Sequence, residues 1–260
     1  GLNHMNSLGC ISVFNETLDA LSLAPSNIGK RNSSPIKYSD GVEIDFISKT
    51  ATIKHQGQVK IKNIDDVLSF DIGSEVEYIK EGGVILGAKF GENVKASVLF
   101  SGILEDVDNI SEWTLAVEAN KPDTYATTGY ICSLGGDGAT SLVRLGFTGD
   151  YRARSLFFND SGTILADLST SSANELPADG YSKICASIDD KLASLDATSL
   201  ASRSVKVINT GTPPTNQAIN RLKIGWGTSL TSTESFIIRS IAVSFLSSTE
   251  KRGRTITAFN

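Results

Sequence analysis

The sequence predicts an all-β fold, an antiparallel sandwich or barrel, from three observations. Runs of about four to eight residues, rich in β-branched and aromatic side chains, recur along most of the chain. Turn-forming residues separate these runs, most clearly GGDG at 135–138 and NDSG at 159–162. No helical periodicity alternates with the runs, which disfavours an α/β fold.

Residues 1–40 are predicted to be a leader and linker that precede the β-rich part. Residues 1–4 resemble a cloning scar, so the natural chain is expected to begin at Met5. Apolar side chains at Ile11, Phe14, Leu18 and Leu21 form one helical stripe and also match two heptads of a coiled-coil seam. A short helix would either pack on its own domain or join copies of the chain into a homo-oligomer.

Residues 41–86 are predicted to form a small β meander, and residues 87–260 the main sandwich. The run from Trp113 to Ala119 shows alternation most clearly, with Trp113, Leu115 and Val117 on one face, so Trp113 is expected in the core. The sequence leaves open whether the meander packs into the sandwich. The expected meander strands span 42–46, 51–53, 58–61, 76–79 and 84–86. The expected body strands span 96–100, 113–119, 130–134, 142–147, 155–158, 163–168, 182–188, 205–209, 222–224 and 236–246.

Composition and charge exclude several classes of protein. The 260 residues are 40% hydrophobic and 20% charged, which is ordinary for a soluble globular protein. The formal net charge of −5 and the absence of a long basic run argue against a nucleic-acid partner. No apolar run approaches the roughly 20 residues of a membrane span, so no membrane insertion is expected. Cys132 and Cys185 lie in strand-like runs and are expected to be small apolar core residues, a disulfide pair being the alternative.

The order of four segments in the body, about residues 87–251, resembles the concanavalin A-like (laminin G-like) family of lectins and glucanases. The segments are EWTLAVEA, ICSLGGDGATSLVRLGF, DGYSKICASI and the IGWG that precedes a long closing strand. The upstream strands with VEIDF are similar to the region ahead of lectin-like modules in bacteriophage tail and fibre proteins.

The resemblance implies a jelly-roll β-sandwich in a virion or extracellular protein, with a non-catalytic role in binding host surface carbohydrate. Two alternatives stay open. One is a polysaccharide-degrading enzyme of the same fold, and the other is a purely structural virion adaptor or decoration protein that has no glycan ligand. The resemblance therefore implies that the partners are glycans or other virion proteins.

Catalytic groups are sparse. Hydrolases of this family that cut β-glucans carry E-x-D-x-x-E, because two carboxylates must flank one glycosidic bond. The nearest match is Glu43, Asp45 and Ser48, in which serine replaces the final acid. His55 is the one histidine outside residues 1–4, so any Ser-His-Asp triad or histidine-rich zinc site would depend on it alone. No catalytic residue is therefore assigned.

Glycan binding needs an aromatic platform and polar side chains that hydrogen-bond sugar hydroxyls. Trp226 is the strongest candidate, because the glycines on either side open space around its ring, the alternative being a half-buried tryptophan at the rim that packs on its own sheet. Arg152 and Arg154 would clasp an anionic glycan or, alternatively, belong to a solvated strand face. The remaining candidates are polar or aromatic residues expected on loops: Asp137, Tyr151, Asn159, Asp160 and Tyr125.

No cofactor is expected. The exception is Ca²⁺, for which Asp106, Asp108 and Asn109 offer oxygen ligands, the alternative being an ordinary polar loop.

Overall fold

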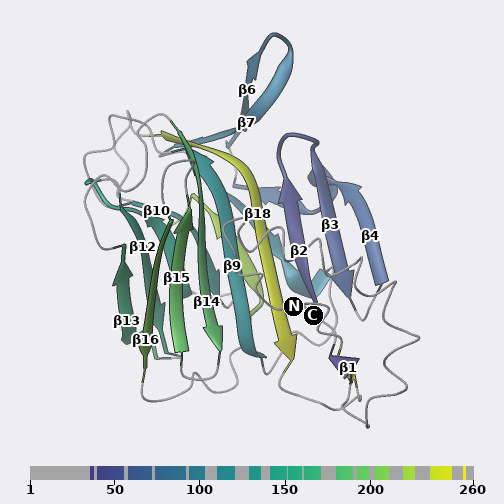
Figure 1. Cartoon of the computed structure of the whole chain (residues 1–260). Helices are drawn as coiled ribbons and strands as arrows, with labels where there is room; N and C mark the ends of the chain where they lie inside the picture. The colour runs from purple at the N-terminus through teal and green to yellow at the C-terminus, as the bar shows by residue number, and fades with distance from the viewer. Residues whose placement is uncertain are drawn as a thin grey trace.

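Two antiparallel sheets packed face to face make up the sandwich, which confirms the predicted class (Figure 1). The structure is a computed structural model. It describes residues 36–37, 40–55, 58–71, 74–91, 94–102, 110–120, 129–135, 141–150, 152–159, 161–170, 180–189, 192–198, 203–210, 219–225, 235–247 and 254–255. Within these ranges the helical segments are two 3-10 turns, Ile64–Asp66 and Phe100–Gly102.

The ten-stranded sheet has the order β16-β15-β14-β9-β18-β2-β3-β4, with β7 also pairing β18 and β6 pairing β7. β18 pairs with β9 along one edge, and its other edge is shared between β7 and β2. Its strands are β2 (Asp40–Asp45), β3 (Thr50–His55), β4 (Gln58–Asn63), β6 (Glu77–Glu81), β7 (Val84–Gly91), β9 (Ile110–Asn120), β14 (Tyr181–Asp189), β15 (Leu192–Thr198), β16 (Arg203–Asn209) and β18 (Ser235–Ser247).

The seven-stranded sheet has the order β13-β12-β11-β10-β17-β8-β5. Its strands are β5 (Leu68–Phe70), β8 (Ala96–Leu99), β10 (Gly129–Gly135), β11 (Ser141–Phe147), β12 (Ala153–Phe158), β13 (Ile164–Ser169) and β17 (Arg221–Ile224). Separately, β1 (Ile36–Lys37) and β19 (Arg254–Thr255) form a short parallel pair.

The strands from the 41–86 segment belong to the sandwich, which answers the question that the sequence left open. β2 lies directly beside β18, with Ile44 opposite Ile241 and Val42 opposite Val243. The β6–β7 hairpin projects beyond the end of the sheets, with its base on β18 (Figure 1). Two glycines, Gly82 and Gly83, form the hairpin tip with positive φ, which glycine adopts without the strain of a side chain.

The core lies between the sheets and follows the alternation of the strands. Trp113 of β9 is buried and stacks on Phe157 of β12, with ring centroids 5.8 Å apart, so this contact joins the two sheets. The prediction that Trp113 is a core residue is confirmed. A second aromatic group, Phe46, Phe90 and Phe236, fills the region beneath β2, β7 and β18.

Four strands were not expected: β1, β5, β15 and β19, of which β1 and β19 have two residues each. β15 was missed because its core-facing positions include Ala193 and Ala197, whose small side chains give a weak hydrophobic pattern around Leu195. β5 has only three residues. The predicted helical leader lies outside the described residues.

The cysteines divide into one confirmed and one wrong expectation. Cys132 is free and fully buried, and burial raises the pKa of its thiol, so it is an inert core residue as expected. Cys185 is disulfide-bonded, so the expectation of a free thiol there is wrong. Among the described residues no helix has the length and apolarity needed to cross a membrane.

Candidate functional site

The partial match to a catalytic carboxylate motif is part of a turn. Asp45 accepts hydrogen bonds from the Ile47 and Ser48 amides, at 2.8 and 3.2 Å, and from the Ser48 hydroxyl at 2.8 Å. Its carboxylate therefore holds the β2–β3 turn closed. His55 pairs through Nδ1 with Asp40 Oδ2 at 2.9 Å. Asp45 and Asp40 thus both have structural partners.

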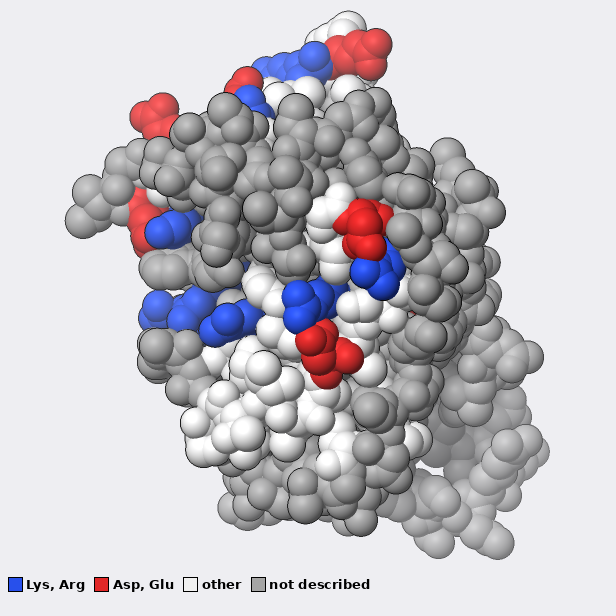
Figure 2. Space-filling view, turned by 90° about the vertical axis from the view of Figure 1, so that its left-hand side faces the viewer, with Lys and Arg blue, Asp and Glu red and all other residues white. Residues whose placement is uncertain are grey.

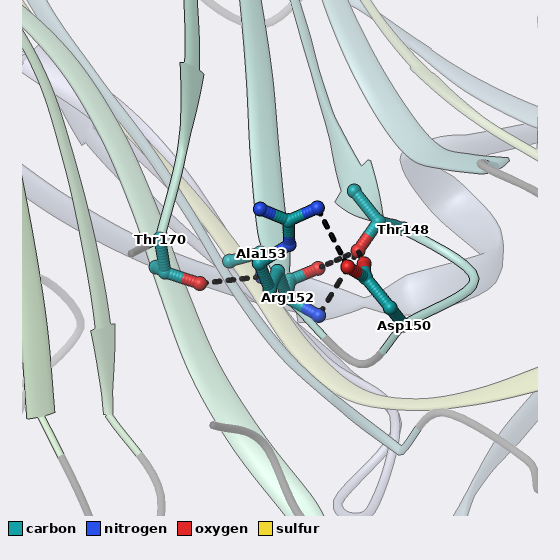
Figure 3. Close-up of polar contacts among 5 residues, drawn as sticks. All are labelled: Thr148, Asp150, Arg152, Ala153 and Thr170. Atoms are coloured by element: carbon teal, nitrogen blue, oxygen red, sulfur yellow. Dashed lines mark hydrogen bonds and ion pairs between the residues drawn. The ribbon is translucent and has the colours of Figure 1, made fainter. Parts of the chain in front are cut away.

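Arg152 stabilises the turn between β11 and β12 (Figure 3). Its guanidinium lies 2.6 Å from Asp150 Oδ2, and its amide donates to Thr148 Oγ1 at 3.0 Å. The Thr148 hydroxyl also donates to Asp150. The hydrogen bond from the Arg152 side chain, followed by that from the Thr148 hydroxyl, lowers the pKa of Asp150. Across the strand end, the Ala153 amide donates to Thr170 Oγ1 at 3.2 Å.

Asn159 lies at the opposite end of β12. Its side-chain oxygen accepts from the Ser161 amide, the Ser161 hydroxyl and the Thr163 amide, at 3.1, 2.7 and 2.8 Å. It therefore closes the β12–β13 turn. Because the six residues of β12 separate them, Arg152 and Asn159 are roughly 23 Å apart at the strand rise per residue. The structure does not bring these two candidates into one site.

Several predicted residues lie outside the described ranges. These are Asp137, Tyr151, Asp160, Trp226, Tyr125 and the calcium candidates Asp106, Asp108 and Asn109. In the described part of the chain no group of three or more histidine, cysteine, aspartate or glutamate side chains is placed to hold a metal ion.

Arg154, in contrast, lies in a cross-strand row on the outer face of the seven-stranded sheet. Arg154 on β12 is opposite Gly146 on β11, which is opposite Tyr130 on β10. The Arg154 guanidinium binds Asp167 of β13 through two parallel hydrogen bonds, of 2.9 and 2.6 Å. Gly146 leaves the middle of the row without a side chain, between the guanidinium and the Tyr130 ring.

Gly146 is required by a close approach of β10. The register shifts between Tyr130 and Cys132, and at this bulge an added Cβ on Gly146 would lie 2.0 Å from the Gly129 carbonyl oxygen. It would also lie 2.6 Å from Tyr130 Cα. No larger residue fits without movement of the backbone, because both of these atoms belong to the main chain of β10.

A second row, at Arg144 instead of Gly146 of β11, carries two more cations. Arg144 on β11 is opposite Ser133 on β10, which is opposite Lys223 on β17. Its neighbours Val143 and Leu145 are fully buried in the core, so alternation directs Arg144 outward. Its guanidinium lies 5.0 Å from the centre of the Phe158 ring, and its Nε donates to the Ser141 hydroxyl at 3.5 Å.

We call these two rows the basic face, defined by Tyr130, Ser133, Arg144, Arg154 and Lys223. Burial raises the pKa of Tyr130, Asp167 raises it further, and Arg154 and Arg144 oppose the rise. Arg154, Asp167 and Arg144 therefore lie within electrostatic reach of the Tyr130 phenol. Figure 2, seen from the side that carries β12, β13 and β16, shows Lys and Arg side chains in a band at mid-height, with acidic side chains beside part of it.

The basic face combines the groups that saccharide binding needs. A half-buried aromatic ring offers a surface for the C–H face of a sugar, and the arginines and Ser133 offer hydrogen bonds. The sequence did not predict Tyr130, Arg144 and Lys223 as ligand residues, because such residues were expected on loops. One signal was present: a charged residue interrupts the apolar strand LVRLGF at 142–147, which indicates an outward-facing position.

Comparison with known proteins shows similarity of fold. No protein-family model matches the sequence, and no curated protein matches it. Similar solved structures include the ligand-binding domain of botulinum neurotoxin serotype D in complex with N-acetylneuraminic acid, with a TM-score of 0.53 and 7% identity over 79% of this chain and 47% of the other. A separate structure of the serotype D binding domain has a TM-score of 0.52, with the same identity and coverage.

A third similar structure is the CBM2 module of the evolved Dit protein of Lactobacillus casei BL23 phage J-1. It has a TM-score of 0.49 and 10% identity, over 81% of this chain and 97% of that module. The chain spans about half the length of the toxin domains. At these identities the toxin domains show that the β-sandwich fold is shared.

Proposed function

We propose that this chain is a non-catalytic module that recognises glycans through its basic face. The observation that carries the proposal is the convergence of the half-buried Tyr130 ring with Arg144 and Arg154 on one outer sheet face. A ring flanked by hydrogen-bond donors is the combination by which proteins bind the two sides of a sugar, its apolar C–H surface and its hydroxyls.

Two further observations support this role. The toxin domain that shares the sandwich was solved with N-acetylneuraminic acid, so the fold is compatible with a saccharide ligand. The nearest match to the family's catalytic carboxylates has serine at the third position, Ser48, and uses Asp45 to close a turn. A glycosidase needs two carboxylates across the scissile bond.

The setting that we propose is a bacteriophage tail or fibre protein that binds host surface carbohydrate and acts as a homo-oligomer. It is supported by the order of sequence segments that resembles concanavalin A-like modules and by the heptad-like spacing at 11–21. Trp226, Asp137, Tyr151 and Asp160 remain candidate ligand residues. They would extend the site beyond the basic face.

A glycan array tests the proposal. We expect specific hits with the full chain that disappear in Tyr130→Ala and survive in Tyr78→Ala, a matched loss of a tyrosine on the projecting hairpin. Trp226→Ala in the same format tests whether the site includes that residue. A clean array at high protein concentration would overturn the proposal. Release of reducing ends from a bound polysaccharide would contradict its non-catalytic part and favour an enzyme.

A further inference from the structure

We infer that the outer face of the ten-stranded sheet is the docking surface of the leader, residues 5–23, and that a disulfide between Cys10 and Cys185 fixes the leader there. The inference selects the first of the two roles that the sequence left open for the apolar stripe, packing on its own domain. It does not depend on glycan binding, because Cys185 lies on β14 and the basic face belongs to the other sheet.

The centre of this face is a row of small side chains on three neighbouring strands. Cys185 on β14 is opposite Ala116 on β9, which is opposite Ala242 on β18. Leu115 and Val117, on either side of Ala116, are fully buried in the core, so alternation directs the row outward. The three residues accordingly form a cluster of their own, separate from the core.

This outward row is shielded from solvent. Ala116, Cys185 and Ala242 are between 3% and 5% exposed. On the same face, Lys54 of β3 is 3% exposed, and Asp196 of β15, opposite Cys185, is 8% exposed. Lysine and aspartate rarely reach such burial, and an uncovered sheet face would leave them accessible.

The shielded region is wide, and no described strand lies over it (Figure 1). β15 and β3 are five strand spacings apart in the sheet order, roughly 24 Å at the usual spacing. One side chain cannot cover that width. The cover is therefore a segment of the same chain that lies outside the described residues.

The cysteines identify the segment. The chain has three of them, Cys10, Cys132 and Cys185. Cys185 is disulfide-bonded and Cys132 is free, so Cys10 is the partner that remains within the chain. Cys10 belongs to the leader, and its bond to Cys185 brings the leader to the middle of the shielded face.

The sequence around Cys10 suits this role. Cys10, Phe14, Leu18 and Leu21 follow one another at intervals of four, four and three residues. In a helix this spacing places the cysteine on the same stripe as the apolar side chains. A helix tethered through Cys10 thus turns its apolar stripe toward the sheet, and the alanines beneath leave room for it.

The linker is long enough for this arrangement. Residues 24–35 extend over at most roughly 40 Å. β2, where the sandwich begins, is three strand spacings from β14, about 14 Å. A disulfide persists in oxidising surroundings, which agrees with the virion or extracellular setting proposed above. Because a stripe held on its own sheet cannot join copies of the chain, any homo-oligomer of the oxidised protein uses other surfaces.

Peptide mapping without reductant tests the disulfide. The full chain is alkylated, digested with trypsin and analysed by mass spectrometry before and after reduction. We expect peptides 1–30 and 184–191 to be linked in the monomer and to separate on reduction. Alkylated Cys185 in the unreduced monomer would overturn the bond. A link confined to covalent dimers would place the leader on a second copy and would overturn docking within one chain.

Chemical labelling of Lys54 tests the docking. An acetylating reagent at about pH 8 should label Lys54 much more slowly than Lys60 on the exposed strand β4. Phe14→Asp introduces a charge into the stripe and should speed the labelling of Lys54 by about 10-fold or more, because burying that charge disfavours the docked leader. Asn15→Asp introduces the same charge on the polar side of the stripe and should leave the rate unchanged.

Lys60 is the internal control for folding, because its rate should be equal in wild type and in both variants. Equal rates for Lys54 in Phe14→Asp and Asn15→Asp would show a leader that is tethered without covering the face, and would overturn the docking even where the disulfide is found. None of these measurements uses a saccharide, so their failure is distinct from failure of the proposed glycan binding.

Discussion

Arg239 on the outer face of the ten-stranded sheet and Arg144 on the outer face of the seven-stranded sheet differ in their charged partners. On the ten-stranded sheet, Glu118 binds Arg239 at 3.3 Å and lies 4.0 Å from Lys183. The Arg239 guanidinium also stacks on the Tyr181 ring, 3.5 Å from its centre. On the seven-stranded sheet, Arg154 is likewise paired, with Asp167, whereas Arg144 stacks on a ring and has no carboxylate partner within the described residues.

This difference indicates that the partners of outward-facing cations, and not the core, point to a binding surface in a sandwich. Both faces belong to strands that bury their other side in one core, so the core gives no reason for them to differ. A cation paired with a neighbouring carboxylate has most of its electrostatic potential neutralised within the protein. A cation without such a neighbour presents its potential to a ligand. The contrast therefore lies between Arg239, which has a carboxylate partner, and Arg144, which has none among the described residues.

The largest expected effect comes from Gly146→Ala, which disrupts the row formed by Arg154, Gly146 and Tyr130. Its new Cβ would meet the backbone of β10 at 2.0 Å from the Gly129 carbonyl oxygen. We expect the free energy of unfolding to fall by about 2–3 kcal/mol, as for overpacked sites, together with loss of glycan binding. Chemical denaturation measures the first effect, and the array measures the second.

The control for Gly146→Ala is Gly82→Ala at the tip of the β6–β7 hairpin. Nothing lies within 4 Å of a Cβ added there, although the φ of +56° still strains a side chain. We expect a cost of about 1 kcal/mol and normal glycan binding. Equal losses in the two variants would contradict the close approach that we assign to the bulge.

The next effect concerns Lys54 on the outer face of the ten-stranded sheet. Burial lowers the pKa of its ammonium to about 8, against the attraction of Glu43. Between that value and the usual 10.5 the unfolded chain binds the extra proton, so the free energy of unfolding should rise with pH. The slope should be at most about 1.4 kcal/mol per pH unit. Below pH 8 the contribution no longer changes.

Denaturation at about pH 7.5 and about pH 9.5 measures the Lys54 effect, and this window ends before tyrosines ionise. The upper limit matters because burial raises the pKa of Tyr78, Tyr130 and Tyr181, whose ionisation would lower stability at higher pH. In Lys54→Met the rise should be absent. A rise of the same size in wild type and Lys54→Met would show that another group is responsible.

The smallest effect compares removal of one charge from each face. Glu118→Gln removes the carboxylate that contacts Arg239 and Lys183 and should cost about 1 kcal/mol of unfolding free energy. Arg144→Gln breaks no ion pair with a described residue and should change stability by less than about 0.5 kcal/mol. Denaturant titrations of the two variants at low and high salt provide the measurement. A larger loss in Arg144→Gln would mean that its charge stabilises the fold.

The sequence predicted the strands with strong alternation and missed those without it. Trp113, Leu115 and Val117 mark β9 unambiguously, whereas the alanines of β15 carry too little hydrophobic contrast to mark a strand. Pairing across the chain was also beyond a local pattern. Nothing in residues 42–46 specifies that β2 lies beside β18, because that choice depends on the long-range packing of the core.

The candidate site was predicted only through Arg154. Arg152 and Asn159 were predicted as ligand residues because polar side chains near turns fit that role. In the structure their hydrogen bonds close two turns, and their role as ligand residues stays a prediction. Tyr130, Arg144 and Lys223 come from three strands, and only the register of β10, β11 and β17 brings them together. A single sequence contains no direct information on that register.

The parallel pair β1 and β19 has a practical consequence for protein engineering. Ile36 lies opposite Arg254, so the first and last described segments of the chain meet at one place (Figure 1). A short peptide joining these positions would allow the polypeptide to be reopened elsewhere, for instance between Gly82 and Gly83, as a circular permutant. The same proximity suits the module to insertion within a surface loop of a carrier protein, because both connections to the carrier would leave the module side by side.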